Sequence, residues 1–233
     1  TVPGAVNIPL GTLRERLATM GERAAQQIAL AMKALAEKDD DLAREVIKAD
    51  ALIDKDENDV DELALQILAT RQPVASDLRF ITMSLKFVVD LERIGALTAG
   101  LFGRRIGDLA SGIAKRVLEL NRLPDLAPRV DLGSLASLAQ KNLHAALDSF
   151  VRRDADKAMS VIQADVEIDK LNASLFAELI AHVATDPATV TRVLPLTSVC
   201  RYLERIGDHV KNLAEEVLYI VKATDVRHRP LVS

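Results

Sequence analysis

Apolar residues recur at helical spacing from Leu13 to Val221. In the segment after Asp41 they are separated by three, four or seven residues, which places them on one stripe of a helix. The members of this stripe are Leu42, Val46, Ala49, Ile53, Val60, Leu63 and Ile67. A second stripe of the same kind consists of Val161, Ala164, Ile168, Leu171, Leu175 and Leu179. The pattern predicts long amphipathic helices that each bury one face.

The interruptions of this pattern fall at corresponding places in the two halves of the chain. A helix predicted to end at Glu37 is followed by the acidic run 39–41, which suits the cap and first turn of the next helix. Residues 154–156 play the same part in the second half. The next helix ends before Pro73 in the first half and near Asp186-Pro187 in the second. We therefore predict three helices in each half.

The two halves also share motifs. Leu91-Glu92-Arg93-Ile94-Gly95 returns 112 residues later at 203–207, and Ala49-Asp50-x-x-Ile53-Asp54-Lys55 returns 115 residues later at 164–170. The copies therefore differ in length by three residues, which we place in the turn between the second and third helices, because turns tolerate length changes better than helix interiors do. The chain is interpreted as an internal duplication.

The predicted fold class is all-α, with two similar three-helix bundles related by this repeat. The linker is placed at residues 123–130, because Pro124 and Pro128 cannot both lie inside a helix. The resulting division is 10–122 for the first bundle with an extended third helix, 123–130 for the linker, 131–222 for the second bundle and 223–233 for a tail.

Composition narrows the functional classes. Aromatic residues make up only 3% of the chain, as is typical of packed helices, and the net charge of −4 gives no reason to expect binding to nucleic acid or to an anionic membrane. Cys200 is the single cysteine and cannot form an intrachain disulfide. No apolar run approaches the roughly 18 residues of a spanning helix. We expect a cytoplasmic protein that meets membranes only through protein partners.

Carboxylates form a second stripe beside the apolar one. On the second helix they fall at i, i+4, i+7 and i+11, at Asp50, Asp54, Glu57 and Asp61. Pairs four residues apart recur at Asp165 with Asp169 and at Glu204 with Asp208. Two helices of one bundle could present such pairs to each other, and hard anionic oxygen ligands suit Mg, Ca, Mn or ferric iron. A solvated acidic face, paired with neighbouring lysines and arginines such as Lys55, is the alternative interpretation of the same spacing.

The motif Leu203-Glu204-Arg205-Ile206-Gly207-Asp208-His209, followed by Asn212 and Glu215, resembles that of the PhoU family of phosphate-signalling regulators. The resemblance extends from about Leu10 to Val221 and includes Arg71-Gln72-Pro73, Asp77-Leu78-Arg79, Ser84-Leu85-Lys86 and Asp90-Leu91-Glu92-Arg93-Ile94-Gly95. It implies a cytoplasmic accessory protein, expected to be a homodimer. Its implied partners are the ATPase subunit of the phosphate ABC transporter and a sensor histidine kinase, through which it represses the starvation response when phosphate is plentiful.

Some members of that family carry clusters of iron or other metals at paired acidic motifs. The resemblance therefore implies metal ions, either iron or Zn, Mn, Mg or Ca, on two sets of carboxylates. The second-half set is Asp165, Asp169, Glu204 and Asp208, and the first-half set is Asp50, Asp54 and Glu92.

The first-half motif departs from the family pattern. Ala96 stands where the family has Asp, and Gly100 and Gly103 stand at its later Asn and acidic positions. Asp108 lies about 18 Å farther along a continuous helix and is too distant to replace the missing ligand. Because hard-cation affinity follows the charge and number of ligands, we predict that the second-half site is the stronger one.

No catalytic triad, phosphate-binding glycine loop or nucleophile motif is present, so we predict that the chain is not an enzyme. A carboxylate-bridged di-metal enzyme would need Glu-x-x-His on two helices, and none of the four histidines follows a glutamate by three residues. A purely structural helical scaffold without metal stays open as the other alternative. Asp77, Arg79 and Lys86 match the family but receive no role.

Overall fold

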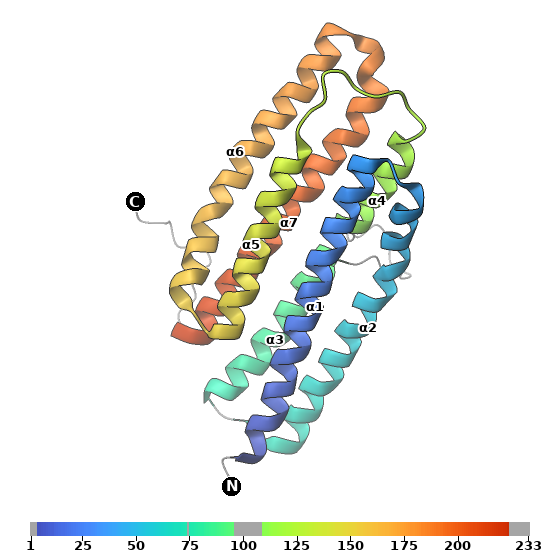
Figure 1. Cartoon of the computed structure of the whole chain (residues 1–233). Coiled ribbons are helices and arrows are strands. Elements are labelled where there is room, and N and C mark those ends of the chain that lie inside the picture. Colours follow the sequence, from blue (N-terminus) through green and yellow to red (C-terminus); the bar gives the residue numbers. More distant parts are fainter. Residues whose placement is uncertain (1–3, 74, 96–108, 224–233) are drawn as a thin grey trace.

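The computed structural model describes residues 4–73, 75–95 and 109–223. These residues form long helices and contain no strand (Figure 1). The elements are α1 (Gly4–Glu37), α2 (Asp40–Arg71), α3 (Ala75–Gly95), α4 (Leu109–Leu120), α5 (Leu132–Arg152), α6 (Ala155–Thr185), the short 3₁₀ helix η1 (Pro187–Thr189) and α7 (Val190–Lys222). The prediction of an all-α fold with two similar three-helix bundles is confirmed. One bundle consists of α1, α2 and α3, and the other of α5, α6 and α7.

The first turn of each bundle is built in the same way. Lys38 directly follows α1 and has a φ of 58°. Arg153 lies 115 residues later, directly follows α5 and has a φ of 54°. Each is followed by an aspartate that caps the next helix: the Asp39 side chain accepts from the Leu42 amide, and the Asp154 side chain accepts from the amides of residues 156 and 157. The side-chain oxygen satisfies amides that have no partner within the helix, which fixes where α2 and α6 begin.

The two bundles lie side by side and share one hydrophobic core. α1 packs against α5, α3 packs against α7, and α4 packs against α7, α1 and α2 (Figure 1). Fully buried side chains from both halves contribute to this core, among them Leu17, Phe87, Leu143 and Leu203. α4 thus contacts both halves, although it falls within the predicted first unit. The segment 96–108, which was expected to extend the third helix and includes Ala96, Gly100, Gly103 and Asp108, lies outside the described residues.

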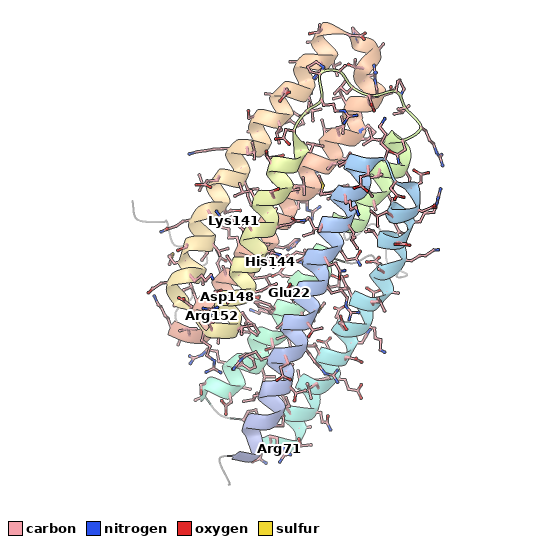
Figure 2. The ribbon with its side chains drawn as sticks, in the orientation of Figure 1. Glu22, Arg71, Lys141, His144, Asp148 and Arg152 are labelled. Carbon is pink, nitrogen blue, oxygen red and sulfur yellow. The ribbon has the colours of Figure 1, made fainter. Side chains whose placement is uncertain are left out.

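Two glycines allow the halves to approach each other closely. A Cβ atom on Gly21 of α1 would collide with the Leu147 side chain on α5, and one on Gly112 of α4 would lie 2.9 Å from the Tyr202 ring on α7. At the surface of the same seam, His144 Nδ1 on α5 lies 3.7 Å from Glu22 on α1 (Figure 2). In the described part of the chain, no helix combines the length and the apolar character needed to cross a bilayer.

Candidate metal centres

The first acidic cluster lies between α2 and α3. Asp54 and Glu57 stand one turn apart on α2, and Glu92 comes from the repeated motif near the end of α3. One carboxylate oxygen from each of the three side chains lies within 4.8 Å of the others, and all three side chains are half-buried. Among the described residues this trio is the only set of three acidic, cysteine or histidine ligands that converges so closely. It is a ready arrangement of hard oxygen donors.

Burial and mutual repulsion disfavour the charged state of this cluster. Burial raises the pKa of Asp54, and burial followed by the charges of Asp61 and Asp54 raises the pKa of Glu57. Asp54 Oδ1 is buried and accepts no hydrogen bond from the described part of the protein. Since a buried acceptor without a donor is costly, a cation bound here would satisfy this oxygen and offset the repulsion.

The composition of this cluster differs in one position from the predicted set. Asp50 is buried one turn before Asp54 and is not a member of the close trio, and Glu57 supplies the third oxygen instead. The signal for Glu57 is present in the sequence: it lies three residues after Asp54 on the acidic stripe, so both side chains lie on the same face of α2.

The second acidic cluster lies between α6 and α7. Asp165 and Asp169 come from α6, and Glu204 and Asp208 come from α7. A Cβ atom on Gly207 would lie 3.0 Å from Ile168 Cδ1 and 3.5 Å from Asp165 Oδ1, so the absence of a side chain lets the two helices approach at this level. The repeated glycine of the motif therefore controls how near the two carboxylate pairs come to each other.

These four carboxylates influence one another electrostatically. The pKa of Glu204 is raised mainly by burial, and further by the negative charges of Asp208 and Asp169. The pKa of Asp208 is also raised mainly by burial, and further by the negative charges of Asp165 and Asp169. The four residues that the sequence selected for the second half are therefore close enough to interact electrostatically. The side chain of Asn172 partly opposes the rise in the pKa of Glu204.

A lysine occupies part of the second cluster. Lys211 Nζ donates to Asp165 Oδ2 over 2.9 Å, and this hydrogen bond raises the pKa of the lysine. The other carboxylate oxygen of Asp165 is buried and accepts no hydrogen bond from the described residues. Sequence reasoning missed Lys211, although it follows Asp208 by three residues on α7 and therefore lies on the same face. It would compete with a metal ion for this carboxylate.

His209, next to Asp208 in the sequence, has a different role from the carboxylates beside it. Its Nδ1 lies 2.8 Å from Asp90 Oδ1 on α3, and both side chains are buried. It therefore connects α7 of one bundle with α3 of the other. The sequence repeat could not reveal this pair, because Tyr202 stands at the position equivalent to Asp90.

Both clusters consist of oxygen donors, which fit Mg, Ca, Mn or ferric iron better than metals that prefer thiolate ligands. The α6/α7 cluster has more carboxylates, which favours it through charge. In the α2/α3 cluster the carboxylate oxygens converge more closely, which favours metal binding there through geometry. The greater strength expected of the second site therefore stays a prediction.

Comparison with known proteins identifies relatives along nearly the whole chain. The family model described as PhoU domain matches residues 17–99 and 132–217. The phosphate-specific transport system accessory protein PhoU homolog of Pseudomonas aeruginosa is 41% identical over 224 residues, covering 95% of this chain and 87% of that protein. The accessory protein PhoU of Escherichia coli K12 is 34% identical over 227 residues, covering 97% of this chain and 89% of that protein.

Solved structures agree with this similarity. The crystal structure of PhoU from Pseudomonas aeruginosa matches with a TM-score of 0.84 and 39% identity, covering 94% of this chain and 99% of that one. The phosphate transport system regulatory protein PhoU from Streptococcus pneumoniae matches with a TM-score of 0.83 and 26% identity, covering 95% and 99%. These relatives are named as accessory or regulatory proteins and not as enzymes, in agreement with the prediction from the sequence. The chain belongs to the PhoU family.

Proposed function

We propose that this protein regulates phosphate uptake as an accessory component of a phosphate transport system. The observation that carries this proposal is the 41% identity to a named accessory protein over 95% of the chain. In the finer form of the proposal, the protein is a cytoplasmic adapter between the transporter ATPase subunit and a sensor histidine kinase. It represses the starvation response when phosphate is plentiful, and it works as a homodimer.

The adapter role is tested by capture of its partners. The purified protein is immobilised and incubated with the transporter ATPase subunit or with the kinase, each with and without inorganic phosphate. We expect both partners to be retained and the retention of at least one to depend on phosphate. Failure to retain either partner under both conditions would contradict the adapter role. Light scattering or sedimentation of the purified protein tests the homodimer separately.

We also propose that metal ions bind the two acidic clusters. The close trio of Asp54, Glu57 and Glu92 supports this most directly, and the repetition of carboxylates between α6 and α7 supports it further. A bound cation would neutralise the mutual repulsion of the carboxylates and tie α2 to α3, or α6 to α7. Its expected role is to stabilise the helix pairs.

Metal content of variants tests this part of the proposal. Asp54→Asn keeps the side-chain volume and removes one charged ligand, so we expect a loss of metal from the α2/α3 cluster. Asp41→Asn is the matched control, because Asp41 is exposed at the start of the same helix and pairs with Arg44. Elemental analysis after dialysis against Mn or iron measures the difference. Equal metal content in both variants would contradict binding at the trio.

The hydrogen bond from Lys211 to Asp165 favours a second candidate for the α6/α7 cluster, a metal-free structural site. In that case the lysine would provide the positive charge that a metal ion provides otherwise. Asp208→Asn distinguishes the two, because it should lower metal content only if the cluster binds metal.

A further inference from the structure

Two arginines from different halves of the protein meet at one aromatic ring. The Arg14 guanidinium on α1 lies 5.2 Å from the centroid of the Phe80 ring on α3, and the Arg153 guanidinium in the turn between α5 and α6 lies 5.8 Å from it. Phe80 is buried and stacks on Phe150 of α5, with the ring centroids 5.9 Å apart. The two cations therefore stand where the two bundles meet, against a buried aromatic surface.

The charges of these two arginines are not balanced by the described residues. No ion pair with an aspartate or glutamate of the described chain involves either of them, and Arg14 Nε is buried without a hydrogen-bond acceptor. Burial and the charge of Arg153 lower the pKa of Arg14. The ring face attracts both cations through its quadrupole but carries no net charge with which to neutralise them.

Two acidic side chains beside this turn, Asp148 and Asp154, have other partners. Asp148 binds Arg152, with 2.6 Å between Oδ1 and Nε, and also binds Lys157. Asp148 and Arg152 both lie at the end of α5 (Figure 2). The Asp154 side chain accepts from two backbone amides at the start of α6.

The equivalent turn of the first bundle shows what balances such a cluster. Lys38 occupies the position of Arg153 in the repeat, and its ammonium group pairs with Asp125 of the linker. Arg129 binds the other oxygen of the same carboxylate at 3.1 Å, and Arg192 donates to the Asp125 backbone carbonyl at 3.0 Å. These interactions lower the pKa of Asp125. The protein thus supplies an anion to the basic turn after α1. The described residues supply none to the equivalent turn after α5.

We propose that Arg14 and Arg153 form a binding site for a tetrahedral oxyanion, and that inorganic phosphate is its ligand. Guanidinium groups match the oxygens of phosphate in a bidentate manner, and a dianion balances two positive charges where a carboxylate would balance one. Binding would tie α1 and α3 to the turn between α5 and α6 and thereby the two bundles to each other. The choice of phosphate among tetrahedral dianions rests on the proposed function.

Ligand-induced stabilisation of the purified protein tests the site. Thermal unfolding is measured in phosphate, in sulfate and in chloride at equal ionic strength, with each oxyanion at about 10 mM. We expect phosphate and sulfate to raise the midpoint and chloride to leave it unchanged. Sulfate is the shape-matched probe that binds metal ions weakly, so its effect separates the arginine site from the acidic clusters.

Variants locate the effect. Arg14→Gln and Arg153→Gln should each weaken phosphate binding by at least about tenfold, because each removes a charged donor. Arg152→Gln is the matched control, since it removes the neighbouring charge, which is 71% exposed and already paired with Asp148. Arg153→Lys reproduces the residue of the equivalent turn and should bind with intermediate affinity. Far-UV circular dichroism confirms that each variant is folded.

The proposal is overturned if phosphate and sulfate do not stabilise the wild-type protein, or if both glutamine variants keep wild-type affinity. It is also overturned if the variants lose capture of a protein partner while wild-type protein binds no phosphate, since the arginines would then recognise an acidic partner. These measurements use the isolated protein. A chain that binds phosphate here but captures neither the ATPase nor the kinase would support the site and contradict the proposed function.

Discussion

His209 on α7 and Asp90 on α3 form a buried contact between the two bundles, with Nδ1 2.8 Å from Oδ1. Each side chain is about nine-tenths buried, so neither has ready access to water as an alternative partner. Buried polar groups lower the stability of the folded state little while they are paired, and considerably when one partner is removed. The pair is therefore expected to specify the register of α3 against α7.

Removal of this contact gives the first prediction. Asp90→Ala should lower the free energy of unfolding by about 2–4 kcal/mol, because it leaves the imidazole buried without its acceptor. Urea denaturation measures the loss. His144→Ala is the control, since it breaks a 3.7 Å contact with Glu22 at the surface, and should cost less than about 1 kcal/mol. A loss from Asp90→Ala no larger than the control would show that the buried pair contributes little.

The glycine of the repeated motif on α7 gives the second prediction. Gly207→Ala should lower the unfolding free energy by about 1–3 kcal/mol and weaken metal binding between α6 and α7, because the new methyl group would lie 3.0 Å from Ile168. The additional change Ile168→Val should restore part of the stability, because it removes Cδ1, the nearer of the two Ile168 atoms that the new methyl group would meet. Gly11→Ala is the control, because open space surrounds that position, and a helix gains from alanine. Equal effects at positions 207 and 11 would contradict close packing at the motif.

Lys211 gives the third prediction. Lys211→Met should increase Mn binding at the α6/α7 cluster, because it frees Asp165 Oδ2 from the ammonium group that lies 2.9 Å away. In the absence of metal the same change should destabilise the protein, since a buried carboxylate loses its only cationic partner in the described structure. Calorimetric titration measures the first effect and denaturation in EDTA the second. Lys170→Met on α6 is the control for loss of a charge, and an unchanged Mn affinity in Lys211→Met would contradict competition.

The fourth prediction concerns pH. The raised pKa of Glu57 means that the native state binds a proton there more readily than the unfolded chain does. The metal-free protein should therefore gain stability as pH falls from neutral through this raised pKa, and lose it as pH rises again. Asp148 gives the stability a pH dependence of the opposite sign at lower pH. Its pKa is lowered, mainly by the hydrogen bond from Lys157, so its contribution is present above the ordinary carboxylate range and is lost in acid.

Denaturation in EDTA across mildly acidic to neutral pH measures this dependence. Glu57→Gln should flatten the slope in that interval, and Glu45→Gln, on the exposed face of α2, should not. Added Mn should stabilise the wild-type protein most at neutral pH, where the carboxylates are ionised. An identical slope in the wild type and in Glu57→Gln would contradict the assignment to this cluster.

The fifth prediction concerns the single cysteine. Cys200 is fully buried, and burial raises the pKa of its thiol to about 11. Since the thiolate is the reactive form, the native protein should react with iodoacetamide far more slowly than the urea-unfolded chain. Mass spectrometry of the labelled protein measures the ratio. Rapid labelling of native protein would show that the helices around Cys200 open frequently.

Sequence reasoning succeeded where the determinant was local. Asp39 and Asp154 cap the helices that they were predicted to cap, because a side-chain oxygen next to free helix amides needs no distant partner. The repeat then gave the architecture of two bundles. It also singled out four carboxylates on α6 and α7 that interact electrostatically in the structure, and their role as metal ligands stays a prediction.

It failed where the determinant was a contact between distant segments. The convergence of Asp54, Glu57 and Glu92 depends on the rotation of α2 against α3, and spacing on one helix does not specify this rotation. The meeting of Arg14 and Arg153 at Phe80 depends on how the two bundles face each other. Neither the helical period nor the internal repeat contains that information.

The contacts of α1 with α5 and of α3 with α7 join helices that are copies of each other. Such pairing of like with like is the geometry of a twofold-symmetric dimer, so this single chain is organised as two subunits joined by a covalent linker. In a dimer of identical chains every substitution appears twice. Here Lys211 could enter one acidic cluster, and Asp125 could balance one basic turn, without a matching change in the other half. A single chain that holds both halves can therefore place different partners at equivalent positions of the repeat.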